Sequence, residues 1–179
     1  MSENKRQRKR KILAQGRHLR LVDEGGWEMV ERMGINGIVV LVATTAKGEL
    51  VLVEQYRHPV AGRVIELPAG LAGDLPGAES EELLVAAKRE LLEETGYDSI
   101  DWAVLTVGPI SPGLSNEVVT FFRAREAVQI EAGGGDEREE IEVHVVPLAR
   151  AGAWLEARRQ AGTQVDPKVY AGLYFAERG

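Results

Sequence analysis

Three glutamates stand close together near the middle of the chain, in the segment Lys88-Arg-Glu-Leu-Leu-Glu-Glu-Thr-Gly96. Glu90 lies three residues before Glu93 and four before Glu94, so a helix would place all three carboxylates on one face. Like charges at this spacing repel each other, at a cost of about 0.2–0.5 kcal/mol per pair. A sequence that accepts this cost is consistent with a site for a hard cation such as Mg²⁺, which leaves coordination positions open for phosphate oxygens.

Arg89 lies next to these acids and could orient a carboxylate through paired hydrogen bonds. An exposed, glutamate-rich helix face would give the same pattern, so the helix alone leaves both interpretations open. The turn Pro68-Ala-Gly70 upstream favours a site, because its free carbonyl groups could join the metal ligands.

The elements that would position these residues follow from hydrophobic periodicity and turn signals. Strands are predicted at 18–23, 27–32, 37–45, 50–56, 63–67, 101–107, 118–124 and 141–146. Helices are predicted from Ser80, as N-cap, to Gly96, then at 149–160 and at 167–176, where Asp166 is the N-cap. Loops are expected at 71–78 and 132–140. This order predicts an α+β fold with α/β/α layers around mixed sheets.

Composition restricts the class of protein. The 179 residues suffice for one core, none is cysteine, and no run approaches the roughly 18 apolar residues that span a bilayer. No apolar run follows the first basic residues, so a secretory signal is not expected. These features predict a cytoplasmic protein without a membrane partner.

Charge is unevenly distributed. Residues 1–11 carry six basic side chains and one acid, although the whole chain has a net charge of −6. Residues 1–17 are interpreted as a basic arm; because it lacks aromatic residues, a solvated arm is favoured over nucleic-acid binding. The acidic remainder would need metal ions to handle an anionic substrate.

The segment Arg89–Tyr97 resembles the second half of the signature of the Nudix hydrolases, and Glu81 lies eight residues before Arg89 as that signature requires. The glycine that should precede Glu81 by six residues is displaced, since Gly70 lies eleven residues before it, which indicates an insertion within 71–80. The resemblance covers most of residues 18–176. Four segments look like the ADP-ribose pyrophosphatase branch: Val53–Arg57, Glu66–Gly70, Ser111–Gly113 and 136–146.

The resemblance implies an N-terminal antiparallel β extension at 18–34, which would form a homodimer, and a Nudix domain at 35–179. It also implies Mg²⁺, with Mn²⁺ as a substitute. The implied metal ligands are the Ala69 carbonyl, Glu90 and Glu94, with Glu93 assisting. The residue implied to activate the attacking water is Glu137, with Glu139 as its rival.

Substrate contacts are implied in the same way. Arg57 would contact the diphosphate or the terminal ribose, and Pro112, Gly113 and Glu117 would line the cleft. Trp27 could stack on the nucleobase beside Glu28, or could instead pack in the core or in a dimer.

The implied reaction is Mg²⁺-dependent hydrolysis of a nucleoside diphosphate sugar, with ADP-ribose giving AMP and ribose 5-phosphate. Two alternatives stay open. One is another substrate, such as GDP-mannose or a dinucleoside polyphosphate; the other is a non-catalytic Nudix-like module that binds nucleotide.

Overall fold

The computed structural model describes residues 9–135 and 140–178. Its strands are β1 (Arg10–Gln15), β2 (Leu19–Glu24), β3 (Glu28–Arg32), β4 (Gly37–Ala43), β5 (Glu49–Arg57), β6 (Gly62–Glu66), β7 (Ala69–Ala72), β8 (Tyr97–Asp98), β9 (Asp101–Pro109), β10 (Val118–Arg125), β11 (Val128–Gln129), β12 (Glu142–Pro147) and β13 (Gln164–Val165). The helices are α1 (Leu83–Thr95), α2 (Leu148–Gln160), α3 (Pro167–Arg178) and a short 3₁₀ turn at His58–Val60. None of the helices in these described ranges is long and apolar enough to cross a membrane.

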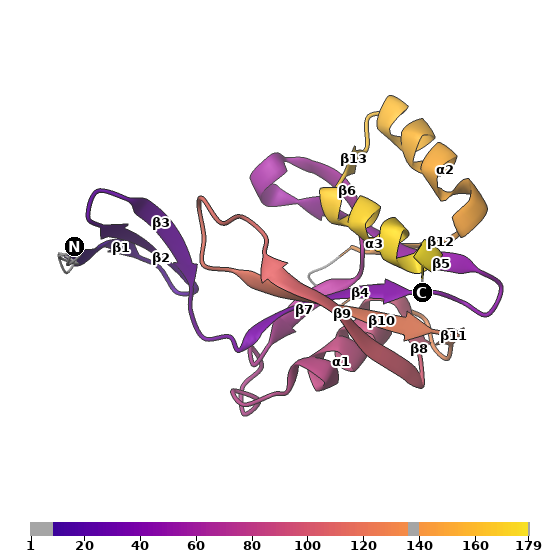
Figure 1. Cartoon of the computed structure of the whole chain (residues 1–179), viewed down its shortest axis with the longest axis horizontal. Helices are drawn as coiled ribbons and strands as arrows, with labels where there is room; N and C mark the ends of the chain where they lie inside the picture. The colour runs from indigo at the N-terminus through magenta and orange to yellow at the C-terminus, as the bar shows by residue number, and fades with distance from the viewer. Residues whose placement is uncertain (1–8, 136–139, 179) are drawn as a thin grey trace, which may run out of the picture.

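Two four-stranded sheets form the body of the molecule, in the orders β7-β4-β10-β9 and β12-β5-β6-β13. Both are mixed, because β10 runs parallel to β4 and β13 parallel to β6 while the other pairs are antiparallel. Figure 1 shows α1 on one side of the body and α2 and α3 on the other. The predicted α+β fold with α/β/α layers is confirmed.

The central strand β4 explains the layering. Val39 and Leu41 pack in a cluster with Ala87 and Leu91 of α1, whereas Val40 and Val42 face the cluster that contains α2 and α3. Successive side chains of a strand point to opposite faces, so the continuous apolar run of β4 buries both faces of its sheet.

The helix that carries the glutamates ends where the sequence predicted, at Gly96, whose φ of 74° is left-handed. Its start is different. Glu82 is the N-cap residue and Ser80 lies outside the helix, so the prediction of Ser80 as N-cap is wrong. Glu81 instead accepts hydrogen bonds from Arg89 and from the Gly73 N–H, which ties the inserted loop to the helix.

The turn at Pro68 moves the chain from one sheet to the other. After β6, residues Ala69–Ala72 form β7, which pairs antiparallel with β4. The sequence analysis predicted a loop from residue 71 onward and missed this strand. Its consequence is that Ala69 and Gly70 lie on a sheet edge directly beneath α1.

The N-terminal extension is a separate three-stranded sheet, β1-β2-β3, which projects from the body (Figure 1). The predicted antiparallel strands β2 and β3 are present, and β1 is an additional strand within the segment interpreted as a basic arm. The sheet meets the body at the loop after β9, where the Val30 N–H donates to the Leu114 carbonyl at 2.8 Å and Arg32 pairs with Glu117 at 2.6 Å.

Candidate active site

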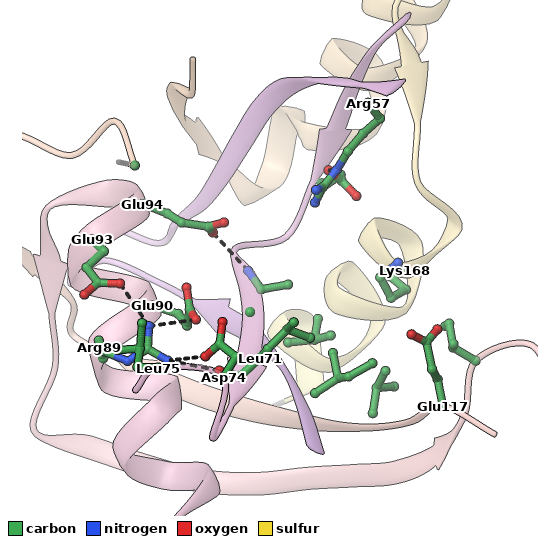
Figure 2. A pocket seen from close by; sticks show the side chains of 18 of the residues that line it. Arg57, Leu71, Asp74, Leu75, Arg89, Glu90, Glu93, Glu94, Glu117 and Lys168 are labelled. Atoms are coloured by element: carbon green, nitrogen blue, oxygen red, sulfur yellow. Dashed lines mark hydrogen bonds and ion pairs between the residues drawn. The ribbon is translucent and has the colours of Figure 1, made fainter. Parts of the chain in front are cut away.

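A cavity of about 830 Å³ opens beside α1, between that helix, β7 and the first turn of α3 (Figure 2). It brings together most of the residues that the sequence singled out: Arg57, Ala69, Arg89, Glu90, Glu93, Glu94 and Glu117. These residues come from three elements, β5, β7 and α1, and from the loop before β10, so the fold rather than local sequence assembles the site.

Arg89 makes hydrogen bonds to several acidic residues on one side of this cavity. Its Nε donates to Glu81 at 3.1 Å, and its Nη1 donates to Glu90 at 2.9 Å and to Glu93 at 3.0 Å. Its Nη2 donates to the Leu71 carbonyl at 3.0 Å. A guanidinium fixed by several acceptors holds each carboxylate in place and offsets part of their mutual repulsion.

Glu90 is the most constrained of the glutamates. Its carboxylate lies against β7 so closely that a Cβ on Gly70 would meet the carboxyl carbon at 1.9 Å. Burial raises the pKa of Glu90 to about 7, although the neighbouring Arg89 opposes that shift. A buried carboxylate with a raised pKa is a group that a bound cation would stabilise in its charged form.

Glu94 is buried, and its Oε2 accepts the Ala69 N–H at 3.0 Å. The end of α1 also holds the following loop, because Gly134 donates to the Glu94 carbonyl and Gly135 to the Glu93 carbonyl, each at 3.0 Å. Gly135 lines the cavity. The predicted residues Glu137 and Glu139 lie outside the described residues.

Three basic side chains line the cavity away from the α1 acids, and each is paired with a carboxylate. Arg57 pairs with Glu66 and Arg32 with Glu117, both at 2.6 Å, and Lys168 pairs with Asp166. Figure 2 shows Arg57, Lys168 and Glu117 across the cavity from Glu90 and Glu93. The sequence analysis missed Arg32 and Lys168, since neither lies in a motif.

Four of the predicted substrate contacts are not among the residues that line this cavity: Trp27, Glu28, Pro112 and Gly113. All four are exposed, Trp27 to 58%. Trp27 and Glu28 stand at the start of β3 on the projecting sheet, so the alternative in which Trp27 packs in the core of its own chain is wrong.

A second acidic group occurs on the sheet β12-β5-β6-β13. Among the described residues, only Glu54, Glu142 and His144 bring three potential metal-ligand atoms within 4.8 Å of one another. However, Glu54 is bonded to Arg63 at 2.9 Å and also to Arg158, so two positive charges already neutralise this group. Burial alone would raise the pKa of Glu54, but its bonds with Arg63, Arg158 and His144 lower it. This cluster is a structural ion-pair network.

The cavity beside α1 has a different charge balance. Seven acidic and four basic side chains of the described residues line it, and its donors are carboxylate and carbonyl oxygens, which suit Mg²⁺. An anionic diphosphate could not enter so acidic a cavity without cations to offset the repulsion. The residues present therefore fit a divalent metal.

The chain is similar to several known proteins. A family model described as NUDIX domain matches residues 35–171. The chain is 37% identical over 123 residues to the ADP-ribose pyrophosphatase of Bacillus subtilis (strain 168), which covers 68% of this chain and 64% of that protein. It is 35% identical over 124 residues to the GDP-mannose pyrophosphatase of Salmonella arizonae, covering 65% of this chain and 62% of that protein.

The matched stretch thus spans less than two thirds of the length of these relatives. Among solved structures, one described as the crystal structure of ADP compounds hydrolase superposes with a TM-score of 0.68 at 24% identity. The superposition covers 95% of this chain and 90% of that chain. This structural match supports the fold.

Proposed function

The chain belongs to the NUDIX family, and we propose that it hydrolyses the diphosphate bond of a nucleoside diphosphate sugar with the help of Mg²⁺. The proposal rests on how acidic and basic side chains are distributed around one cavity. Glu90, Glu93 and Glu94 line one side of it, while Arg32, Arg57 and Lys168 line the rest. Such a cavity suits a substrate with a metal-bound diphosphate in the middle and polar groups at both ends.

The residues of α1 and β7 would hold the metal. Glu90 and Glu94, the Ala69 carbonyl and, in support, Glu93 are the proposed ligands, and Mn²⁺ would serve in place of Mg²⁺. When bound, the metal neutralises charge on the diphosphate oxygens. Arg89 keeps Glu90 and Glu93 oriented through the two hydrogen bonds from its Nη1.

The attacking water needs a base, which we assign to Glu137, with Glu139 as the alternative. The support is positional: Gly135, two residues earlier, lines the cavity and is held by the end of α1. A carboxylate near that point could accept the proton of a water aimed at a phosphorus atom. Arg57 would bind the diphosphate or the terminal sugar, with Glu66 holding its guanidinium.

ADP-ribose is the proposed substrate, giving AMP and ribose 5-phosphate. The relative from Bacillus subtilis supports it, and the relative from Salmonella arizonae supports GDP-mannose as the second candidate. A non-catalytic nucleotide-binding module is less consistent with Arg89, Glu90, Glu93 and Glu94 all lining one cavity wall, with Glu81 bonded to Arg89 behind them.

The test is phosphate release from a panel of ADP-ribose, ADP-glucose, GDP-mannose and diadenosine polyphosphates, after treatment of the products with phosphatase, with and without Mg²⁺. We expect turnover only with the metal and the highest kcat/KM for ADP-ribose. Preference for GDP-mannose would support the second candidate. Binding without any turnover in the presence of Mg²⁺ or Mn²⁺ would contradict the enzymatic proposal.

A further inference from the structure

The loop that follows β11 is attached to the last turn of α1. The Gly134 N–H donates to the Glu94 carbonyl and the Gly135 N–H to the Glu93 carbonyl, each at 3.0 Å. The last carbonyl groups of a helix have no partner within the helix, so this loop completes the hydrogen bonding of α1 at the end that carries the acids. Gly135 also lines the main cavity, which makes the loop part of the cavity wall.

Two glycines allow the loop and the helix to approach this closely. A Cβ on Gly133 would lie 2.2 Å from the carbonyl carbon of Thr95 and 2.5 Å from its Cα, and these are backbone atoms of a fully buried residue. On the helix side, a Cβ on Gly96 would lie 2.1 Å from the Glu131 carbonyl oxygen. Any side chain at either glycine would therefore push the two backbones apart.

The reason for a glycine at position 133 is steric. Gly96, Gly134 and Gly135 have left-handed φ angles of 74°, 138° and 75°, which favour glycine by themselves. Gly133 does not belong to the glycines of the described chain with a positive φ, so its backbone conformation is open to other residues. The contact with Thr95 is what excludes them. Three consecutive glycines are typical of a flexible link, but here the first of them is packed against a helix.

We propose that Gly133 is a positioning residue: its contact with Thr95 holds the loop against the last turn of α1, and thereby fixes the proposed base relative to the metal ligands. This inference rests on the proposed function. Glu93 and Glu94 connect the two parts of the site, because their side chains line the cavity (Figure 2) while their backbone carbonyls hold the loop.

The chain is short between this contact and the proposed base. One residue separates Gly135 from Glu137, and three separate it from the alternative, Glu139; both glutamates lie outside the described residues. A base has to stay within hydrogen-bond reach of the water that it activates. A displacement of about 1 Å in such a group can cost about a hundredfold in rate, so releasing Gly135 from α1 should impair catalysis.

Hydrogen exchange of backbone amides, followed by NMR without metal or substrate, tests the contact itself. In the wild-type protein the Gly134 and Gly135 amides should exchange at least about a hundredfold more slowly than in an unfolded peptide. Gly133→Ala should speed their exchange about tenfold or more and leave the amides of the first turns of α1 unchanged. Gly108→Ala on β9, where a Cβ would meet nothing within 4 Å, is the matched control and should change neither.

Two exchange results would overturn the proposal. One is a peptide-like exchange rate of both amides in the wild-type protein, which needs no variant to fold. The other is a Gly133→Ala protein in which both amides exchange as slowly as in the wild type.

Kinetics on the nucleotide sugar that the wild-type protein hydrolyses best tests the positioning role. Gly133→Ala should lower kcat about a hundredfold, while KM and the Kd for Mg²⁺ from calorimetry stay within about threefold, because the substrate and metal contacts are kept. Unchanged kcat despite faster amide exchange would overturn the role, and so would a loss of Mg²⁺ binding that accounts for the fall in kcat. If the wild-type protein hydrolyses no nucleotide sugar, the proposed function fails, whereas the exchange rates still decide whether Gly133 holds the loop.

Discussion

The Glu90 side chain is only 12% exposed, yet it would have to carry a charge to hold a cation. Its pKa, raised by burial to about 7, means that the metal-free carboxyl is about half protonated near neutral pH. A cation has to displace that proton. We therefore predict that the apparent Kd for Mg²⁺ rises by up to about tenfold per pH unit below pH 7 and levels off above it.

Calorimetric titration of Mg²⁺ at about pH 6 and about pH 8 would measure this dependence. Repeating it in buffers with different ionisation enthalpies would count the released proton. Glu90→Gln is the control, since an amide cannot titrate and its weaker Mg²⁺ binding should not change with pH. A wild-type Kd that is the same at both pH values would contradict the prediction.

The same residue should trade stability for function. Glu90→Gln or Glu94→Gln should lower kcat by about a thousandfold or more because a metal ligand is lost. For Glu90 the metal-free fold should become more stable, by up to about 3 kcal/mol at pH 8, since an acid with a raised pKa penalises the folded state once it must ionise. That gain should shrink as the pH falls from about 7 and vanish below the unfolded value of 4.5.

Urea titrations at several pH values, with kcat measured on the same samples, would show both effects. Near-normal turnover in either variant, or a Glu90→Gln protein less stable than wild type at pH 8, would contradict this account.

At the scale of elements, the contact between β7 and α1 sets the position of the site. A methyl group on Gly70 would overlap the Glu90 carboxylate, which is the movable end of a side chain. Gly70→Ala should therefore fold but displace Glu90, with a loss of activity close to that of Glu90→Gln. Gly152→Ala on α2, where a Cβ would meet nothing within 4 Å, is the matched control and should keep full activity. Thermal melts and kcat would separate misfolding from displacement, and an active Gly70→Ala enzyme would contradict the prediction.

The ion pairs around Glu54, which join β5, β6, β12 and α2, should stabilise the fold, whereas the charge of Glu90 should destabilise it. Glu54→Gln leaves Arg63 and Arg158 without their carboxylate, so it should cost about 3–5 kcal/mol at pH 7. Because the pKa of Glu54 is lowered, its contribution is present above the unfolded value of 4.5 and is lost as the pH falls through the lower folded value.

Guanidinium titrations at pH 7 would measure the loss. Glu142→Gln removes the exposed member of the same cluster and should cost less than about 1 kcal/mol. Similar losses for the two variants would contradict the assigned difference in burial.

The sequence predicted the ends of helices well where a single residue determines them through local contacts. Gly96 ends α1 because it adopts a left-handed conformation, and Asp166 begins α3 because its carboxylate accepts the N–H of Lys168. The sequence-based predictions failed where an element or side chain depends on a partner elsewhere in the chain. β7 exists because it pairs with β4, and Glu81 serves Arg89 and Gly73 rather than the first turn of α1. No periodicity encodes such contacts.

The same limit applies to the candidate active site, because the whole fold brings its residues together. The α1 acids were predictable because helical spacing alone puts them on one face. Arg32 and Lys168 were not, because each reaches the cavity through the fold: Arg32 is positioned by Glu117, which is 85 residues away in the chain. A basic side chain outside a motif has no signature until its partner is known.

The projecting sheet β1-β2-β3 is expected to join two copies of the chain. Ile12, Leu13 and Leu19 of β1 and β2 are 40–49% exposed on an element that meets the body of its own chain mainly at the loop after β9. Apolar residues gathered on a projecting sheet favour association, so we expect a homodimer with twice the 19.6 kDa mass of the chain by light scattering. Ile12→Glu should shift it toward the monomer, because a charge in that interface would lose its hydration. Val128→Glu, at a valine of β11 that is 60% exposed, should not. A wild-type monomer would contradict the prediction, and a dimer unaffected by Ile12→Glu would place the interface elsewhere.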